Sequence, residues 1–249
     1  MVNMLARHGI RGEFTSCLTL TLGRTFRHSE APTGRITFVD PHFRRPARKE
    51  VFAYLVYFIR TLPHLVRHFS VVRKLADKFR VYAFLPRNRF APVRWSYAAE
   101  FHRAYTSVFD EEVLLTADYL THKFKASKSF TAEELSRLAR ERLHHYENVP
   151  FVVTSLLHCS LPCTAIGTPV WFVYEPEMAQ GRFEGNLQFL NVLRLGADGR
   201  IEKSGDRLPP DGCIHVTSVP PVRKEHLPYA ERLAARVGAF MSGEKEGDA

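Results

Sequence analysis

The stretch that decides the fold reads FVVTSLLHCSLPCTAIGTPVWFV and covers residues 151–173. It opens with an uninterrupted apolar run, Phe151–Thr154, of the kind found in parallel strands that are buried on both faces. A helix is predicted from about His158 to Ile166, and Gly167 is a typical residue at a helix end. The run Pro169–Val173 predicts the next strand. Strand, helix and strand in this order form a right-handed parallel βαβ unit.

The flanking sequence extends this pattern. Short apolar runs predict strands. Thr131 and Glu134 form a capping-box pattern that predicts the start of one helix, and periodic apolar residues predict another helix over residues 226–240. The further strands are expected over 14–22, 35–39 and 113–116, a helix over 183–193, and a hairpin over 192–201. We therefore expect an α/β fold with a Rossmann-like parallel sheet over residues 1–40 and 113–241, followed by a disordered tail over 242–249.

Residues 41–112 differ in composition and predict a basic, aromatic helical insertion. The chain has 249 residues, with 35 Lys and Arg against 26 Asp and Glu. A basic balance favours anionic partners. Between residues 44 and 80, basic side chains alternate with apolar ones, so this segment could lie on an anionic membrane surface. The alternative is a packed helical subdomain with solvated charges. Nucleic-acid binding is not expected, because no recognisable binding module accompanies the charge.

The cysteines and the hydropathy indicate the compartment. Cys159 and Cys163 are expected to be buried thiols, because the Cys and His spacing around them does not suit a zinc site, and no metal is predicted. The first 22 residues lack the apolar core of a signal peptide. No run is long enough for a membrane-spanning helix. We expect a cytoplasmic protein, peripheral to the membrane if residues 44–80 bind it.

The candidate chemistry lies at the turn that follows Phe151–Thr154. Ligands of open α/β sheets bind outside the carboxyl ends of the strands. A helix that begins there offers free N–H groups and a partial positive charge, which suit phosphate or carboxylate. Hydroxyls of Thr154, Ser155 and Thr168 could complete an anion cradle, and His158 would hydrogen-bond the anion or transfer a proton.

Three further residues are weaker candidates for substrate binding. His122 and Glu175 follow predicted strands, and Arg182 lies in a loop that could reach the same crevice. For each, the alternative is an ordinary surface or capping role. The strand–turn–helix with one His is itself common in α/β proteins, so chemistry alone leaves the role of His158 open.

The motif resembles that of the polysaccharide pyruvyl transferase family, roughly V-T-S-R-L-H-x-x-x-P-x-x-A-x-G-T-P-V. The matching positions here are Leu157, His158, Pro162, Ala165, Gly167, Thr168, Pro169 and Val170. Residues 8–21, which read HGIRGEFTSCLTLT, are similar to another family segment. Residues 119–122 and 182–186 resemble two more, in the expected order.

The resemblance implies one half of a GT-B-like architecture, with the ligand cleft between two Rossmann-like halves. It implies phosphoenolpyruvate as donor substrate, no further cofactor, and a sugar of a glycan or lipid-linked glycan precursor as acceptor. Pyruvate would be transferred as a ketal, with Leu157 and His158 at the donor and His158 as phosphate ligand or acid.

Two other functions stay open. One is a GT-B glycosyltransferase that uses a sugar nucleotide in the same crevice. The other is a truncated, non-catalytic relic or binding partner. Leu156 stands where the family motif has Arg, and the sequence starts near the middle of the family pattern. We therefore expect a missing N-terminal half or a homo-oligomer to complete the cleft, and activity of this chain alone is in question.

Overall fold

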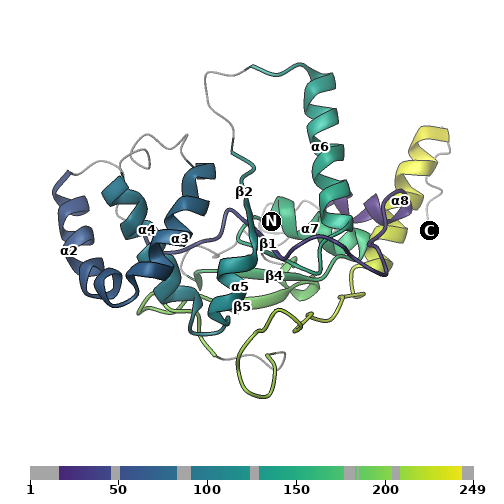
Figure 1. Cartoon of the computed structure of the whole chain (residues 1–249). Coiled ribbons are helices and arrows are strands. Elements are labelled where there is room, and N and C mark those ends of the chain that lie inside the picture. The colour runs from purple at the N-terminus through teal and green to yellow at the C-terminus, as the bar shows by residue number, and fades with distance from the viewer. Residues whose placement is uncertain are drawn as a thin grey trace, which may run out of the picture.

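The computed structural model describes residues 17–45, 51–82, 91–123, 129–176, 183, 185–203 and 208–242. Its centre is one sheet of five parallel strands in the order β2-β1-β3-β4-β5 (Figure 1). The strands are β1 (Thr37–Val39), β2 (Asp118–Leu120), β3 (Val152–Thr154), β4 (Val170–Tyr174) and β5 (Asn191–Arg194). The predicted α/β class and parallel sheet are confirmed.

The strand order places a topological switch point between β1 and β3. The chain leaves β1 for β2 on one side, and then returns past β1 to form β3, β4 and β5 on the other. In doubly wound sheets of this kind the connections diverge at such a point and leave a crevice outside the carboxyl ends of the two strands. The turn after β3 therefore lies where a ligand site is expected.

One face of the sheet is covered by the helices that connect β1 to β2. Side chains of Phe38, Val153 and Trp171 pack into this layer, which includes the fully buried Phe101 and Tyr105. Its elements are α2 (Val51–Arg67), α3 (Phe69–Lys78), η2 (Phe79–Tyr82), α4 (Ala91–Tyr105) and α5 (Glu111–Thr116). The helices predicted as an insertion thus form a layer of the fold, and they lie to the left of the sheet in Figure 1.

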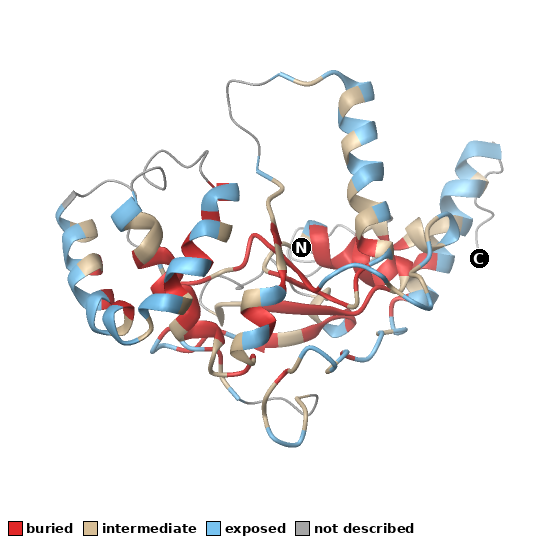
Figure 2. Cartoon of the chain, in the orientation of Figure 1, coloured by how far each residue is buried: buried red, intermediate tan, exposed pale blue. Residues whose placement is uncertain are grey.

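The opposite face is covered by a 3₁₀ helix near the start of the described chain and by helices from its second half. Val39, Val152 and Phe172 pack against Cys159 and Cys163, which are buried free thiols as expected. The elements here are η1 (Leu18–Arg24), α6 (Ala132–Glu147), α7 (Leu157–Ile166), η5 (Leu187–Phe189) and α8 (Leu227–Ser242). Burial is concentrated in the sheet and in the helix faces that contact it (Figure 2). None of the helices in the described part of the chain combines the length and hydropathy needed to cross a membrane.

Three predicted elements are wrong in type. Residues 113–116 belong to helix α5, because the Asp110 side chain accepts from Glu112 N and acidic residues fill the first turn. The strand expected over 14–22 is a 3₁₀ helix in its described part, pressed so closely on α7 that a Cβ on Gly23 would lie 2.2 Å from Ala165 O. The helix expected over 183–193 is instead η5 followed by β5.

Several other local predictions are confirmed, whereas the hairpin expected over 192–201 is reduced to one bridge after β5, which itself belongs to the parallel sheet. Thr131 and Glu134 form the capping box, and Gly167 ends α7 with a φ of 87°. After β5, an antiparallel bridge joins Leu195 to Ile201 around a turn at Gly199. Residues 243–249 of the predicted tail and residues 1–16 lie outside the described residues.

Candidate functional site at the carboxyl edge of the sheet

The turn between β3 and α7 is held by two hydroxyl groups. Thr154 is fully buried, and its Oγ1 donates to Val39 O at 2.9 Å and accepts from Leu156 N at 3.1 Å. Ser155 Oγ donates to Asp40 O at 2.6 Å. These bonds join the ends of β3 and β1 across the switch point. Both hydroxyl protons are therefore committed to the backbone, so these side chains shape the turn and leave anion binding to other donors.

Helix α7 begins at Leu157, at the mouth of this turn. Leu156, the N-cap residue, makes no side-chain capping bond. The amides of Leu157 and His158 belong to the first turn and have no acceptor within the helix. His158 is exposed to solvent, whereas the helix is buried from Cys159 onward. An exposed imidazole and two amides without intrahelical acceptors thus lie at the positive end of a helix dipole, an arrangement that suits an anion.

Asp40 is the residue at this edge that the motif analysis missed. It directly follows β1 and is 9% exposed. Its carboxylate accepts from Thr121 Oγ1 and from His122 N, both at 2.8 Å. Its φ of 42° lies in the left-handed region, which few residues other than glycine adopt. The signal was present in the sequence, because an acidic residue ends the strand at 35–39.

His122 is brought to the same edge but faces into the protein. Its Nε2 lies 2.5 Å from the hydroxyl oxygen of Tyr146. Burial lowers the pKa of His122, and the charge of Arg142 adds to this, while Asp40 acts in the opposite direction. A neutral imidazole bound to a buried tyrosine is a poor phosphate ligand, so His122 supports the loop that carries the Asp40 contacts.

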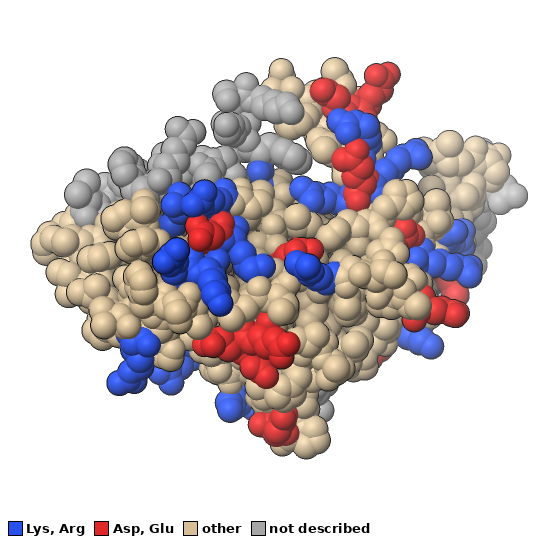
Figure 3. Space-filling model, viewed as in Figure 1, with Lys and Arg blue, Asp and Glu red and all other residues tan. Residues whose placement is uncertain are grey.

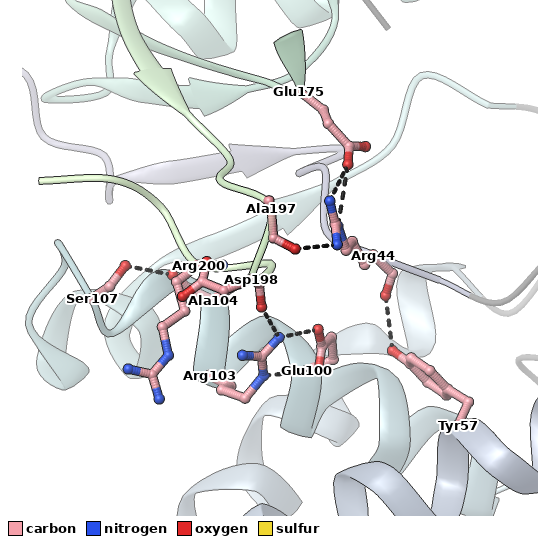
Figure 4. Close-up of polar contacts among 10 residues, drawn as sticks. All are labelled: Arg44, Tyr57, Glu100, Arg103, Ala104, Ser107, Glu175, Ala197, Asp198 and Arg200. Atoms are coloured by element: carbon pink, nitrogen blue, oxygen red, sulfur yellow. Dashed lines mark hydrogen bonds and ion pairs between the residues drawn. The ribbon is translucent and has the colours of Figure 1, made fainter. Parts of the chain in front are cut away.

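Glu175 follows β4 and is held in an ion pair. Arg44 donates to Glu175 Oε1 through Nη2 at 2.9 Å and through Nε at 3.2 Å (Figure 4). His42 Nε2 lies 3.2 Å from Glu175 Oε2. Burial raises the pKa of Glu175, but the bonds and charges of His42 and Arg44 outweigh it and leave the pKa below its usual value. Glu175 is thus an ionised anchor for Arg44.

The Arg44 contacts continue toward β5 and α4. Arg44 also donates to Ala197 O, and its own carbonyl accepts from the hydroxyl of Tyr57 at 3.1 Å. Arg103 binds Glu100 and donates to Asp198 O at 3.1 Å, next to this group in Figure 4. These bonds fix the loop after β5 against α4.

A groove of about 620 Å³ lies beside this network. Aromatic and charged side chains line it together, which is the composition that suits a polar organic ligand. The lining residues include His42, Arg44, Phe52, Tyr57, Arg60 and Glu175. One of these lining residues, His42, follows Asp40 by two residues.

Thr168 is separated from the other candidates. It precedes β4, so it lies at the amino edge of the sheet, opposite the end that carries Ser155. Its Oγ1 donates to Tyr146 O at 2.9 Å, and the side chain is 1% exposed. Thr168 therefore fixes α6 to the start of β4 and is not part of the cradle. Arg182 lies outside the described residues.

Comparisons with known proteins do not assign the chain to a family. Neither the protein-family models, nor the curated proteins, nor the solved structures contain a match to it.

Proposed function

We propose that this chain is a polysaccharide pyruvyl transferase-like domain that binds phosphoenolpyruvate at the start of α7. The observation that carries the proposal is the position of the motif. Its strand, turn and helix meet at the switch point, with His158 exposed and the amides of Leu157 and His158 unpaired within the helix. Phosphoenolpyruvate carries a phosphate and a carboxylate, and this end of a helix attracts both.

The proposed reaction balances with the groups at this edge. Two hydroxyl oxygens of the acceptor sugar add to C2 of the enol, and the bond from C2 to the phosphate oxygen breaks. One hydroxyl proton ends on the methylene carbon, which becomes a methyl group, and the other leaves with inorganic phosphate. His158 would bind the phosphate or donate the proton, because it is the exposed titratable group of the turn.

The acceptor would occupy the groove beside Glu175. The exposed ring of Phe52 suits the apolar face of a sugar ring, while Arg60 suits an anionic lipid-linked precursor. Glu175, which lines the groove, follows β4 at the carboxyl edge of the sheet that also carries the start of α7.

Helix α2 supports peripheral attachment to an anionic membrane. Four large apolar side chains on it lie outside the groove and are exposed to solvent, namely Leu55, Ile59, Leu62 and Val66. The neighbouring helix α3 carries exposed Arg73 and Lys74, and basic side chains gather over this helix in Figure 3. Apolar insertion together with basic contacts to lipid headgroups is the composition of interfacial helices. It would bring the groove near lipid-linked acceptors.

The donor site is tested by titrating phosphoenolpyruvate into the full chain by calorimetry. A hydrogen bond to a charged group such as phosphate contributes about 1.5–3 kcal/mol, so His158→Ala should weaken binding by roughly ten-fold or more. His144→Ala is the matched control, because His144 is also exposed but lies on α6, paired with Glu147. It should bind as the wild type does.

Other outcomes select the alternatives. Equal affinity of the wild type and His158→Ala would remove His158 from the site. Binding of a sugar nucleotide in place of phosphoenolpyruvate would favour a glycosyltransferase. A chain that binds neither would fit the non-catalytic alternative.

A further inference from the structure

A second cluster of chemically active side chains lies in the helical layer, on elements other than the carboxyl-edge loops. It contains three histidines and one glutamate. His64 is near the end of α2, His68 is the N-cap residue of α3, His102 is on α4 and Glu111 is the first residue of α5. The four side chains thus come from α2, from the junction between α2 and α3, from α4 and from α5, and they form one cluster.

The side chains are close enough to share a ligand. The three imidazole rings have centroids 4.5 Å, 4.9 Å and 5.0 Å apart. His102 Nε2 lies 2.8 Å from Glu111 Oε1, and His102 Nδ1 lies 2.8 Å from His64 Nε2. One donor atom from each of His68, His102 and Glu111 falls within 4.8 Å of the other two.

His102 is an imidazole buried in the core of the helical layer, where apolar side chains are usual. Its side chain is 2% exposed, while that of Glu111 is 43% exposed. Burying an imidazole costs free energy unless both nitrogens find partners. Here both nitrogens of His102 are paired, one with the Glu111 carboxylate and one with His64. These bonds fix the orientation of the buried His102 ring, and solvent reaches the cluster at the partly exposed Glu111.

We infer that His68, His102 and Glu111 form a binding site for a divalent transition metal, with Zn²⁺ as the ion that fits best. Two imidazole nitrogens and one carboxylate oxygen are a known zinc ligand set that leaves a position for water. Mg²⁺ and Ca²⁺ prefer oxygen ligands and would not select two histidines. Metal binding through His102 Nε2 leaves its Nδ1–H to donate to His64, the kind of outer hydrogen bond that orients a ligating histidine.

The site would stabilise the fold. The metal would join the α2–α3 junction to α4 and α5, and these helices form the layer over one face of the sheet. Its ligands lie outside the loops that carry Asp40, Ser155 and Glu175. The inference is therefore independent of phosphoenolpyruvate binding. The sequence carries a signal for it, because His64 and His68 are four residues apart, the spacing of neighbours on a helix face.

The test is metal binding by the metal-stripped full chain. Co²⁺ is titrated while its visible absorption is recorded, and Zn²⁺ affinity is measured by competition with a chromophoric chelator. The wild type should bind one equivalent of each ion, and Zn²⁺ should raise its melting temperature. His68→Ala and Glu111→Gln should each weaken Zn²⁺ binding by roughly ten-fold or more and lose the thermal shift.

The variants are chosen so that failure to fold does not obscure the result. His68 and Glu111 are only partly buried, and His68 makes no capping hydrogen bond, so both variants should fold without metal. His144→Ala removes a histidine from another His–Glu pair, that with Glu147, and should bind Zn²⁺ as the wild type does. A wild type that does not bind Co²⁺ or Zn²⁺, or variants that bind them equally well, would overturn the inference.

Discussion

Asp40 joins three strand ends of the sheet through its carboxylate and carbonyl. The carboxylate binds the loop after β2, and the carbonyl accepts from Ser155 after β3. A left-handed residue other than glycine costs about 1–2 kcal/mol, and such strain tends to persist at functional sites. We interpret Asp40 as the positioning residue of the proposed donor site.

Two substitutions of Asp40 test its carboxylate hydrogen bonds and its tolerance of a left-handed backbone. Asp40→Asn keeps an acceptor oxygen and tolerance of the left-handed conformation, so it should cost less stability than Asp40→Ala, which loses both carboxylate bonds. We expect Asp40→Ala to lower the free energy of unfolding by roughly 2–4 kcal/mol. Urea denaturation of the two variants measures the difference. Equal midpoints for Asp40→Ala and the wild type would contradict the assigned contacts.

Which site residues could be predicted depended on whether a local pattern placed them. Ser155 and His158 follow a buried strand and open a helix, so sequence alone put them at the correct edge. Thr168 was misplaced because a hydroxyl near a motif carries no information about which end of the next strand it occupies. The partners of Glu175 come from residues more than 130 positions away, and pairing at that separation leaves no local signal.

Among the elements, those with matching start and stop signals were predicted well. Helix α6 has its capping box and α7 has Gly167, and both were found. Apolar runs alone were misleading. Leu114 and its neighbours form one helical turn because Asp110 caps it, and Leu20 alternates with polar residues yet lies in a 3₁₀ helix against α7. Tertiary contacts decided these short segments.

Helix α2 gives the element whose role is easiest to test. Ile59 is 58% exposed in the middle of its apolar surface. If α2 inserts into an interface, Ile59→Asp removes apolar burial worth about 1.5–3 kcal/mol and adds a repelled charge. We expect at least ten-fold weaker partition onto vesicles that contain phosphatidylglycerol. Sedimentation with these vesicles measures the partition.

The matched control for α2 is Leu135→Asp. Leu135 is 48% exposed on α6. The substitution therefore makes a similar change in hydropathy and charge to that of Ile59→Asp, at a position outside α2 and α3. It should partition as the wild type does. Equal partition of Ile59→Asp and Leu135→Asp would exclude α2 as the contact surface.

For the whole molecule, buried histidines predict how stability depends on pH. Burial is the main cause that lowers the pKa of His42, His122, His145 and His226 below 6.5. The unfolded chain therefore binds protons that the folded chain does not, and stability present above about pH 6.5 is lost as the pH falls. The bonds from Asp211 and Asp110 raise the pKa of His215, which therefore acts oppositely, but its side chain is 43% exposed, so solvent weakens the effect.

Urea midpoints at pH 7.5, 6.5 and 5.5 measure this dependence. Each histidine that gains a proton only on unfolding steepens the loss by up to about 1.4 kcal/mol per pH unit. His226 is 3% exposed, and neither ring nitrogen has a partner among the described residues. His226→Leu should therefore show a shallower loss than the wild type. A midpoint that rises on acidification would contradict the prediction.

The central claim is that the start of α7 at the switch point binds phosphoenolpyruvate. Its most direct test follows backbone amide resonances by ¹H–¹⁵N NMR as phosphoenolpyruvate is added to the full chain. The claim predicts saturable shifts of the Leu157 and His158 amides, with the amide of Thr168 at the opposite sheet edge unchanged. Unchanged resonances for Leu157 and His158 at saturating ligand, or shifts confined to another surface, would contradict it.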